Sequence, residues 1–339
     1  MRTVVTVIVA AALASARPAF ADCTPPTHLS TCIDADTFWP HAGPGSFAFI
    51  GATETTAPGR FGFGLVATHL ARPIVLLVPS ADPAGTEVVA VDRLWNATFL
   101  FSYGLSERLE AGIALPISVY RTGTGISSIR SQQTTSISHT AMRDVRVGAS
   151  YALLPRASRS PPQLFGLIAR LELALPTGAA SSFAGDRSFV AIPALTGDVR
   201  LGRVFAAGEL GARLRKTTDL LGSRVGPQLV SALGIGADLL ESDRLRILLE
   251  AIALPTLVEQ YELTRAGTPP PLVPAEWQLS VRTAVLMSGD LSLGLGGGGP
   301  LTFTGESGIT TPNYRFIFSL RYSPLERNAA DPGAKISAR

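Results

Sequence analysis

The chain has 339 residues, with 29 Lys and Arg against 26 Asp and Glu, 33 Gly, 25 Pro and a mean hydropathy of +0.28. This composition excludes a disordered chain, which would be less hydrophobic and more strongly charged, and a collagen, which would repeat Gly at every third position. After the first twenty residues, no apolar run reaches the roughly 18 residues that a membrane-spanning helix needs. The apolar residues are therefore distributed by alternation with polar ones.

The N-terminus is typical of a secretory signal peptide. Arg2 is followed by an apolar stretch at residues 4–13, and Ala19, Phe20 and Ala21 form an A-x-A cleavage site. We therefore predict that residues 1–21 are a signal peptide. Loss of Arg2 and Arg17 would leave 27 basic against 26 acidic residues. A nearly neutral chain is not expected to bind nucleic acid.

Two cysteines, Cys23 and Cys32, follow the predicted cleavage site. In an exported protein, two cysteines this close in sequence most simply form one local disulfide, and we predict this pairing. The alternative is a metal site that also uses His28 and His41. We expect no metal, because this is an unusual ligand set and C-x2-C spacing is absent. No cofactor is expected either.

From residue 60 onward the sequence alternates with period two, as in a β-strand with one apolar face. In residues 313–322, for example, Tyr314, Phe316 and Phe318 share one face while Arg315 and Arg321 lie on the other. Each segment is about as long as a tilted membrane strand or slightly longer. The twelve predicted strands are residues 60–71, 93–104, 107–120, 142–154, 164–176, 188–201, 203–215, 225–239, 243–255, 275–287, 290–301 and 313–322.

The connections between these segments alternate between long and short along the chain. Residues 72–92 are followed by a short turn at 105–106, and residues 121–141 by the shorter connection 155–163, with the same order thereafter. In an up-and-down arrangement every long connection then lies at one end. We predict an all-β protein: a closed antiparallel transmembrane β-barrel with long outer loops and short periplasmic turns. A soluble β-sandwich would not sort its loops in this way. The first hairpin is predicted to extend beyond the membrane, with strands at residues 73–79 and 86–91.

Closure of the barrel follows from the bilayer, which offers no hydrogen-bond partner to an open sheet edge. Trp95 and Tyr103 lie at the two ends of one apolar face, and Tyr314 and Tyr322 at the ends of another. These aromatic residues are placed as interfacial girdles would be.

Charged residues of both signs occupy the opposite parity, which we predict to face the lumen. A charge on the lipid face would cost about 2–4 kcal/mol at mid-bilayer, so their parity supports the orientation. Two interpretations remain open: a packed, salt-bridged interior and a water-filled channel for small solutes. The predicted lumen or pore-lining residues are Arg108, Glu110, Asp144, Arg146, Arg170, Glu172, Asp198, Arg200, Glu209, Arg213, Arg246, Glu250, Glu276, Arg282, Arg315 and Arg321.

Catalytic patterns are weak. Because twelve-stranded barrels include a phospholipase, Ser136, Ser138 and His139 were considered as a lipase-type site, but no acidic or Asn partner lies nearby in sequence. Residues 294–299 contain G-x-G-x-x-G, but no helix follows to bind a dinucleotide. We expect these glycines to thin one strand so that lumen side chains fit. The chain is not expected to be an enzyme.

Several short motifs stand out along the chain: residues 115–123, Arg-Asp-Val-Arg-Val-Gly at 143–148, Leu-Pro-Thr-Gly at 175–178 with Phe-Ala-Gly-Asp at 183–186, and residues 211–215. Together they resemble the N-terminal barrel of large OmpA-family outer-membrane proteins. The resemblance implies an outer-membrane location and a porin- or transporter-like barrel. That family typically continues into Asp-rich calcium-binding repeats and a peptidoglycan-binding domain, neither of which is expected in this sequence.

The predicted organisation is a signal peptide at residues 1–21, a periplasmic or lumen segment at 22–59, an outer-membrane barrel at 60–322 and a disordered tail at 323–339. The expected function is a structural protein or a narrow passive pore. The alternatives are a substrate-specific small-solute channel and, less favoured, a lipase-type enzyme. Expected partners are outer-membrane lipid, the barrel-assembly machinery and small solutes.

Overall fold

A computed structural model describes residues 29–78, 80, 85–127, 129, 137–155, 164–186, 188–220, 223–240, 245–260, 272–285, 290–302 and 309–324. The strands are β1 (Phe61–Val78), β2 (Thr86–Gly104), β3 (Leu109–Thr122), β4 (Ala141–Met142), β5 (Arg146–Leu154), β6 (Phe165–Ala174), β7 (Val190–Leu201), β8 (Val204–Arg213), β9 (Thr218–Leu220), β10 (Ser223–Val225), β11 (Gln228–Asp238), β12 (Leu245–Ala253), β13 (Ala275–Ala284), β14 (Leu291–Pro300) and β15 (Tyr314–Tyr322). One short 3-10 helix, η1, spans Ala180–Ser182. No helix in this part of the chain is long and apolar enough to cross a membrane.

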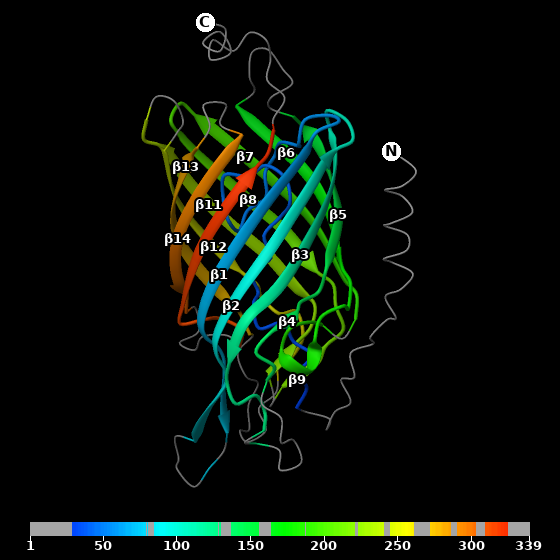
Figure 1. The fold of residues 1–339 in the computed structure, drawn as a ribbon, viewed down its shortest axis with the longest axis vertical. Coiled ribbons are helices and arrows are strands. Elements are labelled where there is room, and N and C mark those ends of the chain that lie inside the picture. The colour runs from blue at the N-terminus through cyan, green and yellow to red at the C-terminus, as the bar shows by residue number, and fades with distance from the viewer. Residues whose placement is uncertain are drawn as a thin grey trace, which may run out of the picture.

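Twelve of the described strands form a closed antiparallel barrel (Figure 1). Each barrel strand pairs with its neighbours in chain order, with β4, β9 and β10 lying outside the ring. The first and last strands close it, in a register that runs from Phe63 opposite Tyr322 to Ala71 opposite Tyr314. The predicted fold class and strand number are confirmed. Closure leaves no unpaired sheet edge, as a bilayer requires.

The connections are sorted by length, as predicted. The turns that follow β2, β7, β11 and β13 are short. The connection after β5, residues 155–164, is longer than these but shorter than the connections after β3, β6, β8, β12 and β14. The long ones carry β4, β9 and η1, which lie together at the lower end of the barrel in Figure 1. We call the two ends the short-turn mouth and the long-loop mouth.

The first hairpin extends beyond the ring at the long-loop mouth, as predicted. β1 and β2 stay paired out to Val78 and Thr86, through register shifts between Ala71 and Val75. Arg72, within this irregular stretch, adopts the left-handed conformation, with a φ of 50°. The bulge bends the ribbon where it leaves the barrel.

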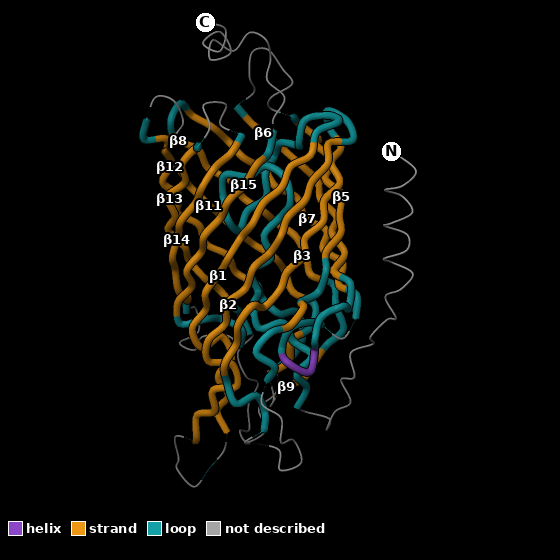
Figure 2. Tube along the Cα trace, in the orientation of Figure 1, coloured by secondary structure: helices purple, strands orange, loops and turns teal. Residues whose placement is uncertain are grey.

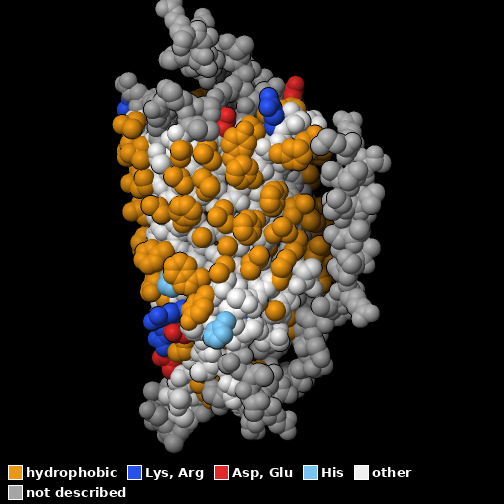
Figure 3. Space-filling model, in the orientation of Figure 1, with side chains coloured by type: hydrophobic (Ala, Val, Ile, Leu, Met, Phe, Trp, Pro, Cys, Tyr) orange, Lys and Arg blue, Asp and Glu red, His pale blue; other side chains and the backbone are white. Residues whose placement is uncertain are grey.

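The outer face of the barrel is apolar (Figure 3). The alternation seen in the sequence places large side chains outward, among them Phe101, Phe316 and Leu279. The predicted girdle residues stack on neighbours across the sheet: Trp95 lies 4.4 Å from His69, and Tyr103 lies 4.5 Å from Phe61, between ring centroids. These contacts lie near opposite ends of the same strands, as interfacial aromatic residues do.

Residues 29–59 lie inside the barrel rather than beside it, and the loop trace running through the ring in Figure 2 shows part of their path. We call residues 29–59 the lumen segment. At the long-loop mouth the amide of Ser30 donates to the carbonyl of Asp219, and at the short-turn mouth the amide of Ala57 donates to the carbonyl of Pro324, both at 2.9 Å. Of the two predicted locations for this part of the chain, the lumen is therefore the one observed for the described residues.

Candidate functional site

The lumen, filled by the lumen segment, is the candidate functional site. Three polar clusters and one apolar cluster join the segment to the barrel wall.

Two aspartates hold the segment near the long-loop mouth. Asp34 and Asp36 are two residues apart, and both meet Arg143, at 2.8 and 3.2 Å. Asp36 also pairs with Arg315 of β15 at 2.7 Å, and Arg315 in turn pairs with Glu276 of β13 at 2.8 Å. All five side chains are buried. Because two arginines are shared among three carboxylates, loss of either aspartate would leave at least one buried guanidinium with a single carboxylate partner.

His41 lies between two glutamates of the wall. Its Nδ1 is 2.6 Å from Glu172 of β6 and its Nε2 is 3.1 Å from Glu209 of β8. Arg146 pairs with Glu172 at 3.1 Å and Arg170 with Glu209 at 3.3 Å. Two carboxylates can both accept from one imidazole only when both ring nitrogens carry hydrogen, so this geometry suits the imidazolium form.

Glu250 of β12 binds the backbone of the lumen segment. Its carboxylate accepts hydrogen bonds from the amides of Ala48 and Phe49, both at 2.8 Å, and of Ile50 at 3.4 Å. Successive backbone N–H groups that converge on one anion form a typical anion-binding concavity. Here the anion belongs to the wall and the amides to the segment, so the contact fixes the segment's height in the barrel.

An apolar cluster joins the segment to inward-facing wall residues. Phe38, Phe47, Phe49 and Ile50 of the segment are buried, and Phe38 packs edge-on against Phe49 at 5.1 Å between ring centroids. The wall contributes Val66, Leu100, Phe205, Leu248 and Ile317. Burying such side chains is worth on the order of 1.5–3 kcal/mol each. Withdrawal of the segment would expose them to water, which favours the closed lumen.

The predicted lining residues are mostly found on this wall. Those that are buried are Glu110, Asp144, Arg146, Arg170, Glu172, Glu209, Arg213, Glu250, Glu276, Arg315 and Arg321. Asp198, Arg200, Arg246 and Arg282 are partly buried. Arg200 and Arg246 converge on Asp238, at 2.9 and 2.6 Å.

The prediction that Arg108 lines the lumen is wrong. It is exposed, in the turn at residues 105–108. The amides of Leu105 and Ser106 both donate to the carbonyl of Leu109, and the Ser106 hydroxyl accepts from the amides of Arg108 and Leu109. This turn uses four residues where the sequence suggested two, so β3 begins at Leu109 and leaves Arg108 outside the barrel.

Asp144 is buried in the connection before β5, not on a strand. It accepts the amides of Gly178 at 2.8 Å and Asp186 at 2.7 Å. Burial, together with the nearby Asp186 carboxylate, raises the pKa of Asp144 to about 7. Burial also raises the pKa of Asp186, although Arg215 lies 2.9 Å away and opposes the shift. These groups tie the β6–β7 connection to the start of β5.

The predicted lipase-type residues are organised around an arginine. The Ser138 hydroxyl accepts from Nη2 of Arg121 at 2.9 Å, and Nδ1 of His139 lies 3.1 Å from the carbonyl oxygen of Arg121. The Ser138 hydroxyl also donates to the carbonyl of Thr140 at 3.0 Å, so both side chains bind the surrounding loop and Arg121. Ser136 lies outside the described residues.

Only one of the two cysteines of the predicted disulfide lies within the described residues. Cys32 is fully buried in the lumen segment, and Cys23 lies outside the described residues. The predicted signal peptide, residues 1–21, and most of the predicted tail lie outside them as well. Among the described residues, no group of three or more His, Cys, Asp and Glu side chains is arranged to hold a metal ion.

A closed, twelve-stranded antiparallel barrel with an apolar outer face and a charged interior defines the class: a transmembrane β-barrel. Sequence comparison adds nothing to this, because no family model and no curated protein matches the chain. Solved structures do match. The COG4313 outer membrane channel from Pseudomonas putida F1 aligns with a TM-score of 0.55 and 13% identity, covering 81% of this chain and 98% of that one.

Two porins align less closely. The NanC porin gives a TM-score of 0.44 at 8% identity, covering 79% of this chain and 100% of its own, and the KdgM porin gives 0.41 at 9%, covering 77% and 98%. At such identities the likeness concerns the fold.

Proposed function

We propose that the protein is an outer-membrane β-barrel whose lumen is held closed by its own N-terminal segment, acting as a structural element or a narrow passive pore. The observation that carries the proposal is the filled lumen. The segment contributes buried ion pairs with Arg143 and Arg315 and a buried apolar cluster. Three pockets among the described residues each have room for about one or two water molecules.

The proposed location rests on the outer face and on closure. A belt of exposed apolar side chains around a sheet without edges is suited to a lipid bilayer. The motifs that resemble OmpA-family barrels agree with an outer-membrane location, as does the predicted signal peptide at residues 1–21. Outer-membrane lipid and the barrel-assembly machinery are the partners that this location implies.

Single-channel recording in a planar bilayer tests the proposed function. The full-length protein is expected to show little or no steady conductance, because the lumen segment blocks the passage. Asp34→Asn combined with Asp36→Asn should raise the open probability, because Arg143 loses both of its carboxylate partners and Arg315 loses one of its two. Large, steady conductance steps from the unmodified protein would contradict the proposal.

A substrate-specific channel is the second candidate. It is supported by the arginines that approach the lumen from β12, β13 and β15 near the short-turn mouth, which would favour anionic solutes. The solved structure with the similar fold is itself described as an outer membrane channel. Selective uptake of one class of anion into liposomes that contain the protein would favour this candidate over the closed barrel.

A further inference from the structure

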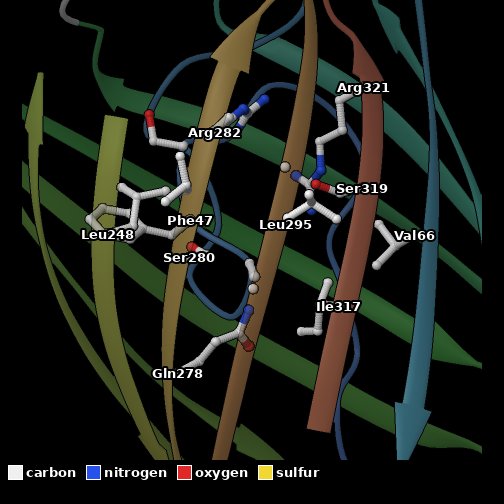
Figure 4. Close-up of a pocket in the computed structure, with 15 residues that line it drawn as sticks. Phe47, Val66, Leu248, Gln278, Ser280, Arg282, Leu295, Ile317, Ser319 and Arg321 are labelled. Atoms are coloured by element: carbon white, nitrogen blue, oxygen red, sulfur yellow. The ribbon is translucent and has the colours of Figure 1, made fainter. Parts of the chain in front are cut away.

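A pocket near the short-turn mouth lies between the lumen segment and strands β13, β14 and β15 (Figure 4). Arg282 enters from β13 and Arg321 from β15, while Ser46 and Phe47 of the segment cover the inner side. We call this space the arginine pocket. The arginine pocket lies near the short-turn mouth, whereas the ion pairs of Asp34 and Asp36 lie near the long-loop mouth.

Within the described part of the chain, neither arginine of this pocket forms a salt bridge, although both interact at longer range with Glu250. Arg282 donates only to the Ser292 hydroxyl, from Nε at 2.9 Å and Nη2 at 2.6 Å. Arg321 is buried, and its charged neighbours are Glu250 and Arg170. The charged neighbours of Arg282 are Arg321, Arg246 and Glu250.

The neighbouring acidic groups are already engaged. Glu250 accepts three backbone amides of the lumen segment, and Asp238 is shared by Arg246 and Arg200. The pocket therefore holds two guanidinium groups without a matching salt bridge. Burying a charge in this way is costly unless a counter-charge is supplied.

An amide in the same pocket also lacks partners. Gln278 is 1% exposed, and neither its side-chain oxygen nor its nitrogen forms a hydrogen bond. The glycines of β14 create the space in front of it: a Cβ at Gly296 would lie 2.7 Å from the Gln278 nitrogen, and one at Gly294 would lie 2.5 Å from the Ser319 hydroxyl. Hydroxyl groups of Ser280 and Ser319 complete the polar lining.

We propose that the arginine pocket binds one small oxyanion, a carboxylate or phosphate group, through Arg282 and Arg321, whose side chains both enter its upper part in Figure 4. The guanidinium fork matches the geometry of such groups, which accept two parallel N–H bonds. An oxyanion would supply a counter-charge in direct hydrogen-bond contact, which Glu250, bound to the backbone of the lumen segment, does not provide. The space, roughly that of one or two waters, suits a single small group. The proposal does not depend on conduction, because a closed barrel can bind an anion from its short-turn mouth.

Isothermal titration calorimetry of the full-length protein in detergent tests the site. Sodium acetate and sodium phosphate replace sodium chloride at constant ionic strength, in separate titrations. Saturable binding of at least one oxyanion is expected, and the tighter of the two identifies the ligand class. Arg282→Gln and Arg321→Gln should each weaken binding about tenfold or more, since each removes charged hydrogen bonds. Arg60→Gln removes an exposed arginine outside the pocket and should leave the affinity unchanged.

A second variant keeps the test decisive if either arginine variant fails to fold, which heat-modifiable gel mobility would reveal. Gly294→Ala adds one methyl group to the pocket, next to a rotatable hydroxyl, and should lower the affinity while the barrel stays folded. Absence of saturable oxyanion binding by the unmodified protein would overturn the proposal. Equal affinity in the unmodified protein and the folded pocket variants would also overturn it, because the binding would then lie elsewhere.

Discussion

Asp144 shows how a single carboxyl group can make this barrel sensitive to pH. It lies in the connection before β5, where two backbone amides bind it and burial raises its pKa to about 7, well above the ordinary value of 3.8. A carboxyl group with a raised folded-state pKa binds its proton more tightly in the folded protein than in the unfolded chain. Stability should therefore fall as the pH rises from about 4 to about 7.

Urea unfolding at pH 5 and pH 8 measures this effect. The unmodified protein should be more stable at pH 5, and Asp144→Asn should reduce the difference between the two pH values, because the titrating group is gone. Asp186 also has a raised pKa, so part of the difference should remain. Asp92→Asn, a surface change on the β1–β2 hairpin, should leave the pH dependence as it is. An unmodified protein that is more stable at pH 8 would contradict the assignment.

At the residue scale, sequence alternation predicted most of the wall but not the lumen segment's role. Outward residues such as Phe101 and Phe316 follow directly from the period of two. Phe38, Phe47 and Phe49 lie in a stretch without periodicity, so nothing local marks them as lumen residues. A signal did exist: Leu100 is an apolar residue among the polar residues of its strand's inward parity, and it packs in the same apolar cluster as these phenylalanines. Apolar side chains on the inward parity indicate a filled barrel.

Strand β14 shows how an element can be shaped by what lies beside it. Its run of glycines is predicted to thin the wall, and Gly298 shows a physical reason for glycine in this strand. A Cβ at Gly298 would lie 1.8 Å from the Trp277 carbonyl oxygen and 2.8 Å from the Gln278 Cα, both backbone atoms of β13 that cannot rotate away. The close approach of β13 and β14 therefore accounts for this glycine within the G-x-G-x-x-G segment, without a bound nucleotide.

Gly298→Ala should therefore destabilise the barrel by about 1–3 kcal/mol, as overpacking does. The unfolding midpoint can be followed by heat-modifiable gel mobility across a temperature series. Gly197→Ala on β7 is the matched control, because the nearest atom to its added Cβ would be 3.7 Å away. Its effect should stay within about 0.5 kcal/mol. Equal midpoints for the two variants would show that the β13–β14 contact does not require glycine.

At the scale of elements, strand number, order and connection lengths were predictable, because alternation and turn composition are local properties. Exact turn lengths were less so, and Arg108 was misplaced because the Ser106 hydroxyl supports a four-residue turn. The partners of the buried charges were not predictable either. Asp36 and Arg315 are 279 positions apart, and only closure of β1 on β15 brings them together.

At the scale of the whole molecule, the barrel and the lumen segment form one folding unit. The segment begins at the long-loop mouth, next to Asp219, and ends at the short-turn mouth, next to Gly104. If the long loops face outward, as in outer-membrane barrels, Leu29 lies at the outer mouth. The chain then runs once through the lumen, from the outer mouth to the opposite mouth, before β1 begins.

The measurement that tests this arrangement most directly is cysteine cross-linking of the membrane-inserted protein. The Thr56 and Ser102 hydroxyl oxygens lie 2.8 Å apart, and the Thr37 hydroxyl lies 3.3 Å from Glu276 near the other mouth. Thr56→Cys with Ser102→Cys should yield a disulfide-linked peptide in mass spectrometry under non-reducing conditions. Thr37→Cys with Glu276→Cys, whose Cβ atoms are separated by the length of the glutamate side chain, should be linked by a short bifunctional thiol reagent. Thr56→Cys with Phe101→Cys, whose second position faces outward, should not. Free, maleimide-reactive thiols in both inward pairs would contradict a lumen filled by residues 29–59.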